Sequence, residues 1–331
     1  MTFCIESIHT DPFRNLALEQ FVFDSLDQKN NYFMLWQNHN AIIVGKHQNT
    51  REEINAAFVK ENNITVARRL SGGGAVYHDL GNLNFTFITG ADKTGGIDFS
   101  VFCEPVREAL CSLGVPVEIS GRNDMTVNGK KFSGNAQYIK NGRIMHHGTI
   151  LYDSDLSILS KALNPGNDKI QSRGIKSLRG RVANIRPYMN TDMPIAGFWA
   201  ELKKYMCAAF DMGELALTPE QNAAVDGLRE NVYCQWNWNY GNSPPYTLRK
   251  ERRIEGCGKI EVLLDVEREG IIKNAAFYGD FFALGEPDDL GAMLKGRHLE
   301  YDELKTALSN TDISLFFNGL DAETFLALLL E

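Results

Sequence analysis

The chain has 331 residues, of which 44% are hydrophobic and 23% charged, a composition typical of soluble globular proteins. It excludes collagen-like and disordered classes, and a chain of this length predicts roughly two domains. The longest purely apolar run, Phe325–Leu330, is six residues long, whereas a membrane-spanning helix needs about 20. The formal net charge of −8 argues against a general attraction to nucleic-acid phosphates. We therefore expect neither a membrane nor a nucleic acid among its partners.

The N-terminus and the cysteines indicate a cytoplasmic, reducing location. The first residues contain no basic segment and include Glu6 and Asp11, which argues against a secretory signal. The cysteines form no CxxC pair and have no neighbouring histidine at metal-ligand spacing. We expect most of them to be buried, reduced thiols; they are Cys4, Cys103, Cys111, Cys207, Cys234 and Cys257.

The first part of the chain mixes strands and helices. Asp11 and Pro12 form an N-cap and a first-turn proline ahead of apolar residues at helical spacing, which predicts a helix there. A second helix is predicted from Asp98 to Leu113, again behind an aspartate cap. Short apolar runs predict strands over 3–8, 32–36, 41–44 and 64–67, with a short helix over 50–62.

The pattern becomes β from Val115 onward. The dipeptides Asn128-Gly129 and Asn141-Gly142 are preferred in two-residue hairpin turns, and they flank residues 130–139. Three antiparallel strands follow from this, the last over 144–151. Helices are predicted over 153–163, 194–210 and 219–232, with an irregular stretch over 164–187.

A domain boundary is predicted at Asn237–Tyr246, where Gly, Ser and two prolines occur without any period. Strands are predicted beyond it over 248–254, 259–266 and 271–278, and helices over 288–294, 301–308 and 321–330. The expected fold class is therefore α+β, with a larger domain over 1–240 that contains a mixed β-sheet and a small α+β domain over 247–331.

A glycine-rich segment, RRLSGGGAVYHDLGN over 68–82, is the first candidate site. Gly72, Gly73 and Gly74 permit positive φ and let a ligand approach backbone N–H groups, which bind phosphate oxygens well. Arg69 adds a planar cation and Ser71 a hydroxyl. The segment matches neither a P-loop nor GxGxxG, and a tight turn or bulge explains the glycines about as well. Further polar groups follow at His78, Asp79 and Asn82.

A lysine pair after the Asn128-Gly129 turn is the second candidate. Lys130 and Lys131 project to opposite faces of a strand, so one of them points inward, where an ammonium group can stabilise a phosphate or carboxylate. Asn123 and Asp124 lie on the partner strand, where Asp124 can orient Lys131 or hold a divalent metal. The alternative is a solvated strand edge. Ser133 and Gly134 weigh against it, because a glycine inside a strand often marks close approach of a ligand.

Two further segments carry polar chemistry. His146 and His147 face opposite sides of a strand and cannot both chelate one ion, so we expect one core histidine and favour a structural or substrate-contact role for His147 with Gly148. The stretch 164–186 has a net charge of +5. A charge run is usually a solvated face, but its glycines and length favour a loop that closes over a polyanion. Its basic residues are Lys169, Arg173, Lys176, Arg179, Arg181 and Arg186.

Together these segments resemble the lipoate-protein ligase family. The resemblance rests on RRLSGGGAVYHDLGN, on the lysine motif NDMTVNGKKFSGNA, and on the later blocks HHGTIL and KSLRGRVAN. The C-terminal run IEVLLDVEREGIIKNAAFYGDFF is similar to the accessory domain of the single-chain ligases. Leu70, Tyr77 and Asn135 differ at positions that the family varies. The resemblance implies a catalytic domain of the biotin and lipoate transferase type, followed by a small accessory domain.

The resemblance also implies a reaction in two steps. Lipoate and ATP, with Mg²⁺, give lipoyl-adenylate and pyrophosphate, and a lysine amine of a lipoyl domain then takes the acyl group. The implied partners are the lipoyl domains of 2-oxoacid dehydrogenase E2 subunits and the glycine cleavage H protein. Activation must place the carboxylate in line with the α-phosphate and neutralise the charge on both.

Site residues follow from the same resemblance. Lys131 is implied as the catalytic residue that bridges the lipoate carboxyl group and the α-phosphate, and Asp124 is a candidate Mg²⁺ ligand. Lipoate contacts are expected from Arg69, Gly74, His78 and Lys131. An apolar tunnel for the lipoate chain is expected among Phe33, Leu35, Val44, Val76 and Phe85. Contacts to ATP or lipoyl-adenylate are expected from Arg69, Ser71, Gly72, Gly73, Gly74, Ala75, Val76, Tyr77, Asn82, Asn123, Lys131, Ser133, Gly134, His147, Gly148, Thr149, Lys176, Arg181 and Val182.

Three other functions remain open. The first is a transferase that moves octanoyl or lipoyl groups between carrier proteins without ATP, through a cysteine thioester; none of the six cysteines lies within the glycine, lysine or histidine blocks, which disfavours it. The second is a module that binds lipoate or a lipoyl domain without activating it. The third is biotin ligation, which the lack of a GRGRxxR-like run disfavours. The choice between octanoate and lipoate stays open.

Overall fold

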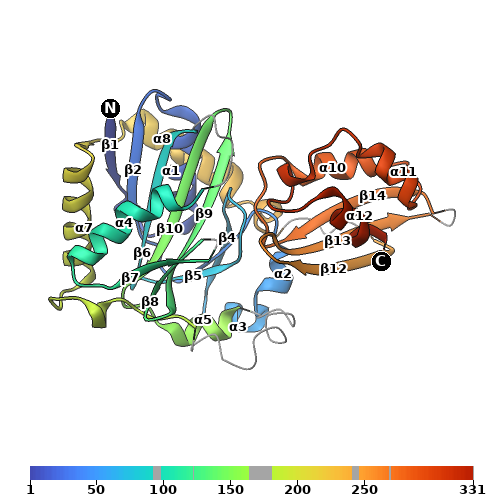
Figure 1. The fold of residues 1–331 in the computed structure, drawn as a ribbon. Coiled ribbons are helices and arrows are strands. Elements are labelled where there is room, and N and C mark those ends of the chain that lie inside the picture. Colours follow the sequence, from blue (N-terminus) through green and yellow to red (C-terminus); the bar gives the residue numbers. More distant parts are fainter. Residues whose placement is uncertain (92–97, 122, 164–180, 241–245, 268–269, 331) are drawn as a thin grey trace.

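The computed structural model describes residues 1–91, 98–121, 123–163, 181–240, 246–267 and 270–330. These residues form a larger part around an eight-stranded sheet and a smaller C-terminal part around a three-stranded sheet (Figure 1). This is the predicted α+β class. The predicted boundary after residue 240 stays a prediction.

The large sheet has the strand order β11-β1-β2-β6-β10-β9-β8-β7. β1 is parallel to β2 and β11, and the other neighbouring pairs are antiparallel, so the sheet is mixed as predicted. Both Asn-Gly turns are confirmed, with positive φ at Asn128, Gly129, Asn141 and Gly142. The strands are β1 Thr2–Glu6, β2 Asn31–Trp36, β6 Asn82–Gly90, β7 Val117–Ser120, β8 Asp124–Val127, β9 Lys130–Lys140, β10 Arg143–Leu151 and β11 Gly213–Glu214.

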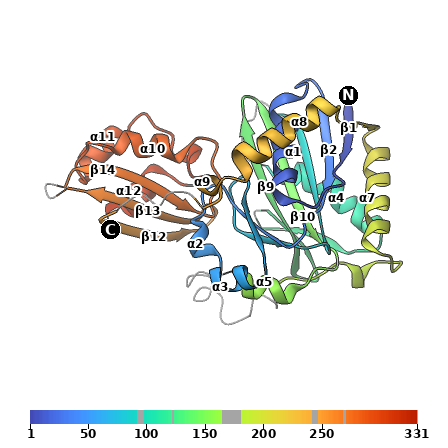
Figure 2. The same cartoon turned by 180° about the vertical axis from the view of Figure 1, so that it is seen from behind.

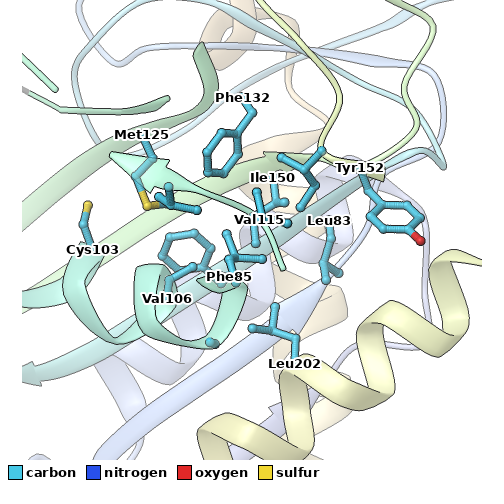
Figure 3. Close-up of a cluster of buried hydrophobic side chains, with 14 of the residues drawn as sticks. Leu83, Phe85, Cys103, Val106, Val115, Met125, Phe132, Ile150, Tyr152 and Leu202 are labelled. Carbon is cyan, nitrogen blue, oxygen red and sulfur yellow. The ribbon is translucent and has the colours of Figure 1, made fainter. Parts of the chain in front are cut away.

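Helices cover the two faces of this sheet differently. On one face, α4 (Ser100–Ser112) and α7 (Ile195–Ala209) pack on apolar side chains of β6 and β10. Figure 3 shows part of this cluster, with Phe85, Val106 and Ile150 among the labelled side chains. On the other face lies α1 (Pro12–Ser25), which begins as predicted, with the Asp11 carboxylate accepting the Phe13 N–H at 3.0 Å.

A second small sheet, β4-β3-β5, carries the glycine-rich segment. It consists of β3 Ala41–Val44, β4 Thr65–Arg68 and β5 Val76–His78. The single helix predicted over 50–62 is wrong, because two helices stand there, α2 Thr50–Glu53 and α3 Ala56–Glu61. Ile54 leaves the helix to bridge with Leu163, and the Asn55 side chain caps α3 by accepting the Phe58 N–H.

The later elements complete the larger part. They are α5 Leu156–Ala162, a 3₁₀ turn at Arg186–Tyr188, α8 Pro219–Leu228, a π turn at Arg229–Tyr233 and α9 Trp236–Tyr240. α9 overlaps the stretch 237–246, in which the domain boundary is predicted. Its Asn239 accepts the Arg68 N–H at 2.9 Å and so ties α9 to β4.

The C-terminal part has its own core. Three antiparallel strands, β12 Leu248–Ile254, β13 Gly258–Val266 and β14 Ile272–Gly279, pack against α10 Pro287–Leu294, α11 Tyr301–Ala307 and α12 Ala322–Leu330, with a 3₁₀ turn at Ile313–Leu315. Figure 2 shows these helices gathered beside the small sheet, away from α7. None of the described helices is long and apolar enough to cross a membrane. Only three of the six cysteines, Cys4, Cys103 and Cys257, are buried, so the prediction that most of them are buried is wrong.

Candidate active site

Arg69 holds the glycine-rich segment together. Its guanidinium is buried and donates to the Ser71 hydroxyl at 3.0 Å, to the Ile43 carbonyl at 3.1 Å, and to the carbonyls of Gly72 and Gly74 at 2.6 and 2.9 Å. Burial lowers the pKa of Arg69 to about 10, so the group stays charged at neutral pH. The cation therefore lies beside the loop, as predicted, but its observed bonds stay within the loop. Its contact with a nucleotide remains a prediction.

The three glycines have different environments. A Cβ at Gly72 would lie 2.3 Å from the Phe281 carbonyl oxygen, and Gly73 has φ +88°. These two therefore fit the tight-turn explanation. A Cβ at Gly74 would meet nothing within 4 Å among the described residues. Gly74 is therefore the glycine at which the structure leaves room for a ligand.

The C-terminal part reaches this loop. Phe281 accepts the Gly73 N–H at 3.2 Å and stacks on His47, with ring centroids 4.9 Å apart. Phe282 is fully buried and packs against Phe99 of the larger part at 5.2 Å. No local pattern indicates that the run GDFF contacts this loop, because its partners lie about 200 residues earlier in the chain.

Ser71 belongs to a buried chain of hydrogen bonds. The Ser71 hydroxyl lies 2.6 Å from His147 Nε2, and His147 Nδ1 lies 3.0 Å from a carboxylate oxygen of Glu19. Because a carboxylate only accepts, His147 carries its hydrogen on Nδ1, and Ser71 donates to Nε2. Thr86 also donates to Glu19, at 2.5 Å, and Trp36 donates to Thr86 at 2.9 Å. His147 is thus hydrogen-bonded to the glycine-rich loop, and its predicted substrate contact remains a prediction.

Lys131 is the inward member of the lysine pair. Its ammonium lies 2.7 Å from an oxygen of Asp124, while Lys130 is exposed. A Cβ at Gly134 would lie 3.0 Å from Lys131 Nζ, so the glycine leaves space for the ammonium group. Asp124 orients Lys131, which was one of its two predicted roles. Its metal role remains a prediction.

The described end of the basic segment runs beside Lys131. The Lys131 N–H donates to the Arg181 carbonyl at 2.8 Å, and the Ala183 N–H donates to the Lys131 carbonyl at 3.0 Å. Val182 thereby bridges with Lys131 in parallel. Residues 164–180, which include Lys176, lie outside the described residues. Arg186 does not join the site, because it pairs with Asp153 and Asp192.

Several of the other predicted site residues are linked by hydrogen bonds close to Lys131. Near Lys131, Asn123 donates to the Asn135 carbonyl at 2.6 Å, Asn135 donates to Ser133 at 3.2 Å, and Thr149 accepts the Gly134 N–H at 3.2 Å. A Cβ at Gly148 would lie 2.2 Å from Asn135 Oδ1, which explains this glycine by packing.

The remaining predicted residues lie on or beside β5. Tyr77 lies in a separate cluster with Ile42, and its hydroxyl donates to Asn40. Asn82 donates to Asn84 at 2.9 Å. Ala75 and Val76 are half-buried at the start of β5. None of these contacts involves Lys131, so their predicted nucleotide contacts remain predictions.

The prediction that five apolar residues form one tunnel wall is wrong. Phe33, Leu35 and Phe85 lie in the core under α4 and α7, Val44 lies in the cluster with Tyr77, and Val76 lies on the α1 side. Alternation along β2 and β6 sends neighbouring side chains to opposite faces. Sequence reasoning missed Glu19, although Asn15 and Glu19 are two polar residues four apart on the buried stripe of α1. That spacing was the available signal.

Comparisons with known proteins agree with this architecture. The family model described as the lipoyl protein ligase A/B catalytic domain matches residues 11–207, and the bacterial lipoate protein ligase C-terminus matches residues 243–329. The chain belongs to the lipoate-protein ligase family.

Individual relatives span the whole chain. Lipoate-protein ligase LplJ of Bacillus subtilis is 42% identical, and the match covers 96% of this chain and 97% of that protein. Lipoate–protein ligase 1 of Staphylococcus aureus is 40% identical, and the match covers 99% of this chain and 100% of that protein. Among solved structures, P. falciparum LipL1 in complex with lipoate has a TM-score of 0.80 at 24% identity, covering 100% of this chain and 98% of that one. The bipartite ligase of Thermoplasma acidophilum, described with its E2 lipoyl domain, has a TM-score of 0.64 at 26% identity, covering 75% and 99%.

Proposed function

We propose that this chain uses ATP to activate lipoate and transfers the lipoyl group to a lysine of a lipoyl domain. The observation that carries the proposal is the position of Lys131. Its ammonium is held by Asp124, lies over the gap left by Gly134, and stands beside the described end of the basic segment. A cation fixed in this way suits a reaction between two anions.

In the first step, an oxygen of the lipoate carboxylate attacks the α-phosphorus of ATP, and the bond from that phosphorus to the pyrophosphate oxygen breaks. Lys131 neutralises charge on the carboxylate and on the α-phosphate while they approach. The backbone at Gly74 provides the open approach for the nucleotide, and Arg69 keeps that backbone in place. The products are lipoyl-adenylate and pyrophosphate.

In the second step, the neutral amine of an acceptor lysine attacks the lipoyl carbonyl. The bond from that carbonyl to AMP breaks, and the amine loses a proton as the amide forms. The acceptors that we propose are lipoyl domains of 2-oxoacid dehydrogenase E2 subunits and the glycine cleavage H protein, in keeping with the E2 lipoyl domain named with the Thermoplasma ligase.

Mg²⁺ belongs to the proposal only as the counter-ion of ATP. Asp124 is paired with Lys131, and the described residues hold no group of three or more His, Cys, Asp or Glu side chains that could hold a metal ion. We therefore route no step through a metal site built from the described residues, and the predicted role of Asp124 as an Mg²⁺ ligand remains a prediction. The cytoplasmic location also stays a prediction.

Transfer without ATP through a cysteine thioester is disfavoured at two of the buried cysteines, Cys4 and Cys103. Such a step needs a thiolate, and burial raises the pKa of Cys4 and of Cys103 to about 12. Neither thiol is ionised at neutral pH.

Lipoate-dependent exchange of pyrophosphate into ATP tests the first step. Lys131→Ala is expected to keep its fold and lose the exchange, because the cation between the two anions is gone. Lys130→Ala is the matched control, since Lys130 is the exposed neighbour on the same strand, and it is expected to keep the exchange. Exchange retained in Lys131→Ala would remove Lys131 from its role. Incubating the wild type with ATP, Mg²⁺, lipoate and a panel of apo lipoyl domains, and weighing the products, tests the second step.

A further inference from the structure

His78 is a buried histidine at the end of β5. It is 2% exposed, and its ring lies 6.1 Å from that of Trp36 in an edge arrangement. Burial, with the neighbouring positive charge of Arg69, lowers the pKa of His78 to about 3, so the ring is neutral at physiological pH. A neutral imidazole has one donor nitrogen and one acceptor nitrogen, and their assignment decides what the ring can bind.

A chain of amides fixes that assignment. Asn15 Nδ2 lies 3.0 Å from the His9 carbonyl and 2.7 Å from the Gln37 carbonyl, so this end of the side chain must be the NH₂ group. The same NH₂ donates to Asn38 Oδ1 at 2.9 Å. Asn38 therefore presents its own NH₂ to His78 Nδ1, at 3.1 Å. Nδ1 is the acceptor, and the hydrogen of His78 must lie on Nε2.

That hydrogen has no acceptor among the described residues. A second buried histidine, His146, has a hydrogen-bond partner at each ring nitrogen. His146 Nδ1 lies 3.1 Å from the Gln137 amide, and His146 Nε2 lies 3.2 Å from Asn135 Oδ1. The two rings have the same tautomer, but only His78 keeps a buried, unpaired donor. A buried donor without an acceptor lowers the stability of the fold unless a ligand supplies the acceptor.

The register of the sheet places His78 far from Lys131. Gly134, Thr149, Asn84 and Trp36 form one row across β9, β10, β6 and β2. Three strand spacings separate the ends of this row, which is about 14 Å. Lys131 Nζ lies next to Gly134 at one end, and His78 lies beside Trp36 at the other. An extended eight-carbon acid with a polar contact at each end spans a comparable distance.

We propose that His78 Nε2–H donates a hydrogen bond to a sulfur of the dithiolane ring, and that this contact makes the enzyme prefer lipoate over sulfur-free acids such as octanoate. The proposal rests on the proposed function, because it needs the carboxylate at Lys131. A disulfide sulfur is a weak acceptor but completes a donor that is otherwise unpaired. An acid without sulfur leaves the His78 donor unpaired. A site that hydrogen-bonds one atom of its substrate discriminates against an analogue that lacks that atom.

The test compares kcat/KM for pyrophosphate exchange with lipoate and with 5-cyclopentylpentanoate, which has a five-membered ring but no sulfur. The wild type is expected to prefer lipoate by about tenfold. His78→Phe keeps a ring without the donor, so the ratio is expected to fall to about one while exchange with the cyclopentyl acid persists. His146→Phe is the control, and it is expected to keep the wild-type ratio.

A ratio near one in the wild type, or an unchanged ratio in His78→Phe, would overturn the proposal. Absence of any lipoate-dependent exchange in the wild type would overturn the proposed function instead. A second measurement does not depend on a variant. The Nε2–H resonance of His78 in the wild type is expected to shift when lipoate is added and to stay in place with 5-cyclopentylpentanoate; equal shifts with both acids would contradict the sulfur contact.

Discussion

The two faces of the large sheet use the same strands for different purposes. On β6, Leu83 and Phe85 point into the apolar core under α4 and α7, while Asn84 and Thr86 point to the other face. We call these the apolar face and the polar face. The polar face carries the Glu19–His147–Ser71 chain and is covered by α1 and the small sheet. Because successive side chains of a strand point to opposite faces, one sheet carries an apolar core on one face and a buried polar site on the other.

The difference explains why the site is buried yet polar. Buried polar groups are stable only when they are bonded to one another, and on the polar face Trp36, Thr86, Glu19 and His147 satisfy each other in sequence. His78, on the facing small sheet, is the exception. We expect substitutions on the apolar face to act on folding, and substitutions on the polar face to act on activity as well.

The largest effect on stability is expected from Phe85→Ala. The side chain is fully buried in the apolar face, and removing a phenyl ring from such a core lowers the free energy of unfolding by about 3–5 kcal/mol. Urea denaturation of the two proteins at pH 7 measures this. A loss under 1 kcal/mol would mean that the apolar face does not carry the fold.

An effect of comparable size is expected from Glu19→Leu on the polar face, where it acts on activity as well as on stability. It removes the acceptor shared by Thr86 and His147, and each unpaired donor costs about 1–3 kcal/mol. Because His147 is then no longer held against Ser71, pyrophosphate exchange is also expected to fall, about tenfold or more. Glu19→Gln is the control, since it retains the oxygen that both donors use. Equal loss in both variants would show that the charge of Glu19, rather than its acceptor, matters.

Gly72 and Gly74 form a matched pair within one loop. Gly72→Ala is expected to lower stability by about 1–3 kcal/mol, because the new Cβ would lie 2.3 Å from the Phe281 carbonyl oxygen. Gly74→Ala has open space and is expected to keep the stability but raise the KM for ATP severalfold. Thermal melting and exchange kinetics separate the two outcomes. A wild-type KM in Gly74→Ala would place the nucleotide elsewhere.

Acid is expected to act on both faces through their histidines. Burial lowers the pKa of His78 to about 3 and the pKa of His146 well below the ordinary value of 6.5. As the pH falls below 6.5, the unfolded chain therefore binds protons that the folded chain does not. Stability is complete above about pH 6.5 and falls with decreasing pH by up to about 1.4 kcal/mol per unit for each histidine.

Urea denaturation of the wild type and of His78→Phe between pH 7 and pH 4 measures this slope. The variant is expected to show a shallower fall, because the proton-binding difference contributed by His78 is gone. An identical slope in the two proteins would show that His78 takes up its proton while folded.

Much of the fold was predictable because it depends on local signals. The Asp11 cap and the two Asn-Gly turns each specify backbone geometry within a few residues, and the structure has them where predicted. The helix over 50–62 failed because a tertiary bridge, Ile54 to Leu163, interrupts it. No local pattern encodes such a contact.

The site was predictable only in part, for a related reason. Motif residues such as Lys131 and Ser71 could be singled out because they stand next to glycines. Their partners could not, because Glu19 reaches His147 across 128 positions, and Phe281 reaches Gly73 across a still longer gap. The expected tunnel wall failed because Phe33, Leu35 and Phe85 lie in the core under α4 and α7, whereas Val44 and Val76 belong to the second small sheet.

The smallest effect is expected from Arg186→Ala. Arg186 was counted with the basic segment, but it pairs with Asp153 and Asp192 at the surface, where ion pairs contribute little. The variant is therefore expected to keep both its melting temperature and its exchange rate within error, whereas Lys131→Ala loses the exchange. A clear rise in the KM for ATP in Arg186→Ala would mean that this arginine leaves its carboxylates to bind the nucleotide, and that the polyanion site extends past Val182 along the chain.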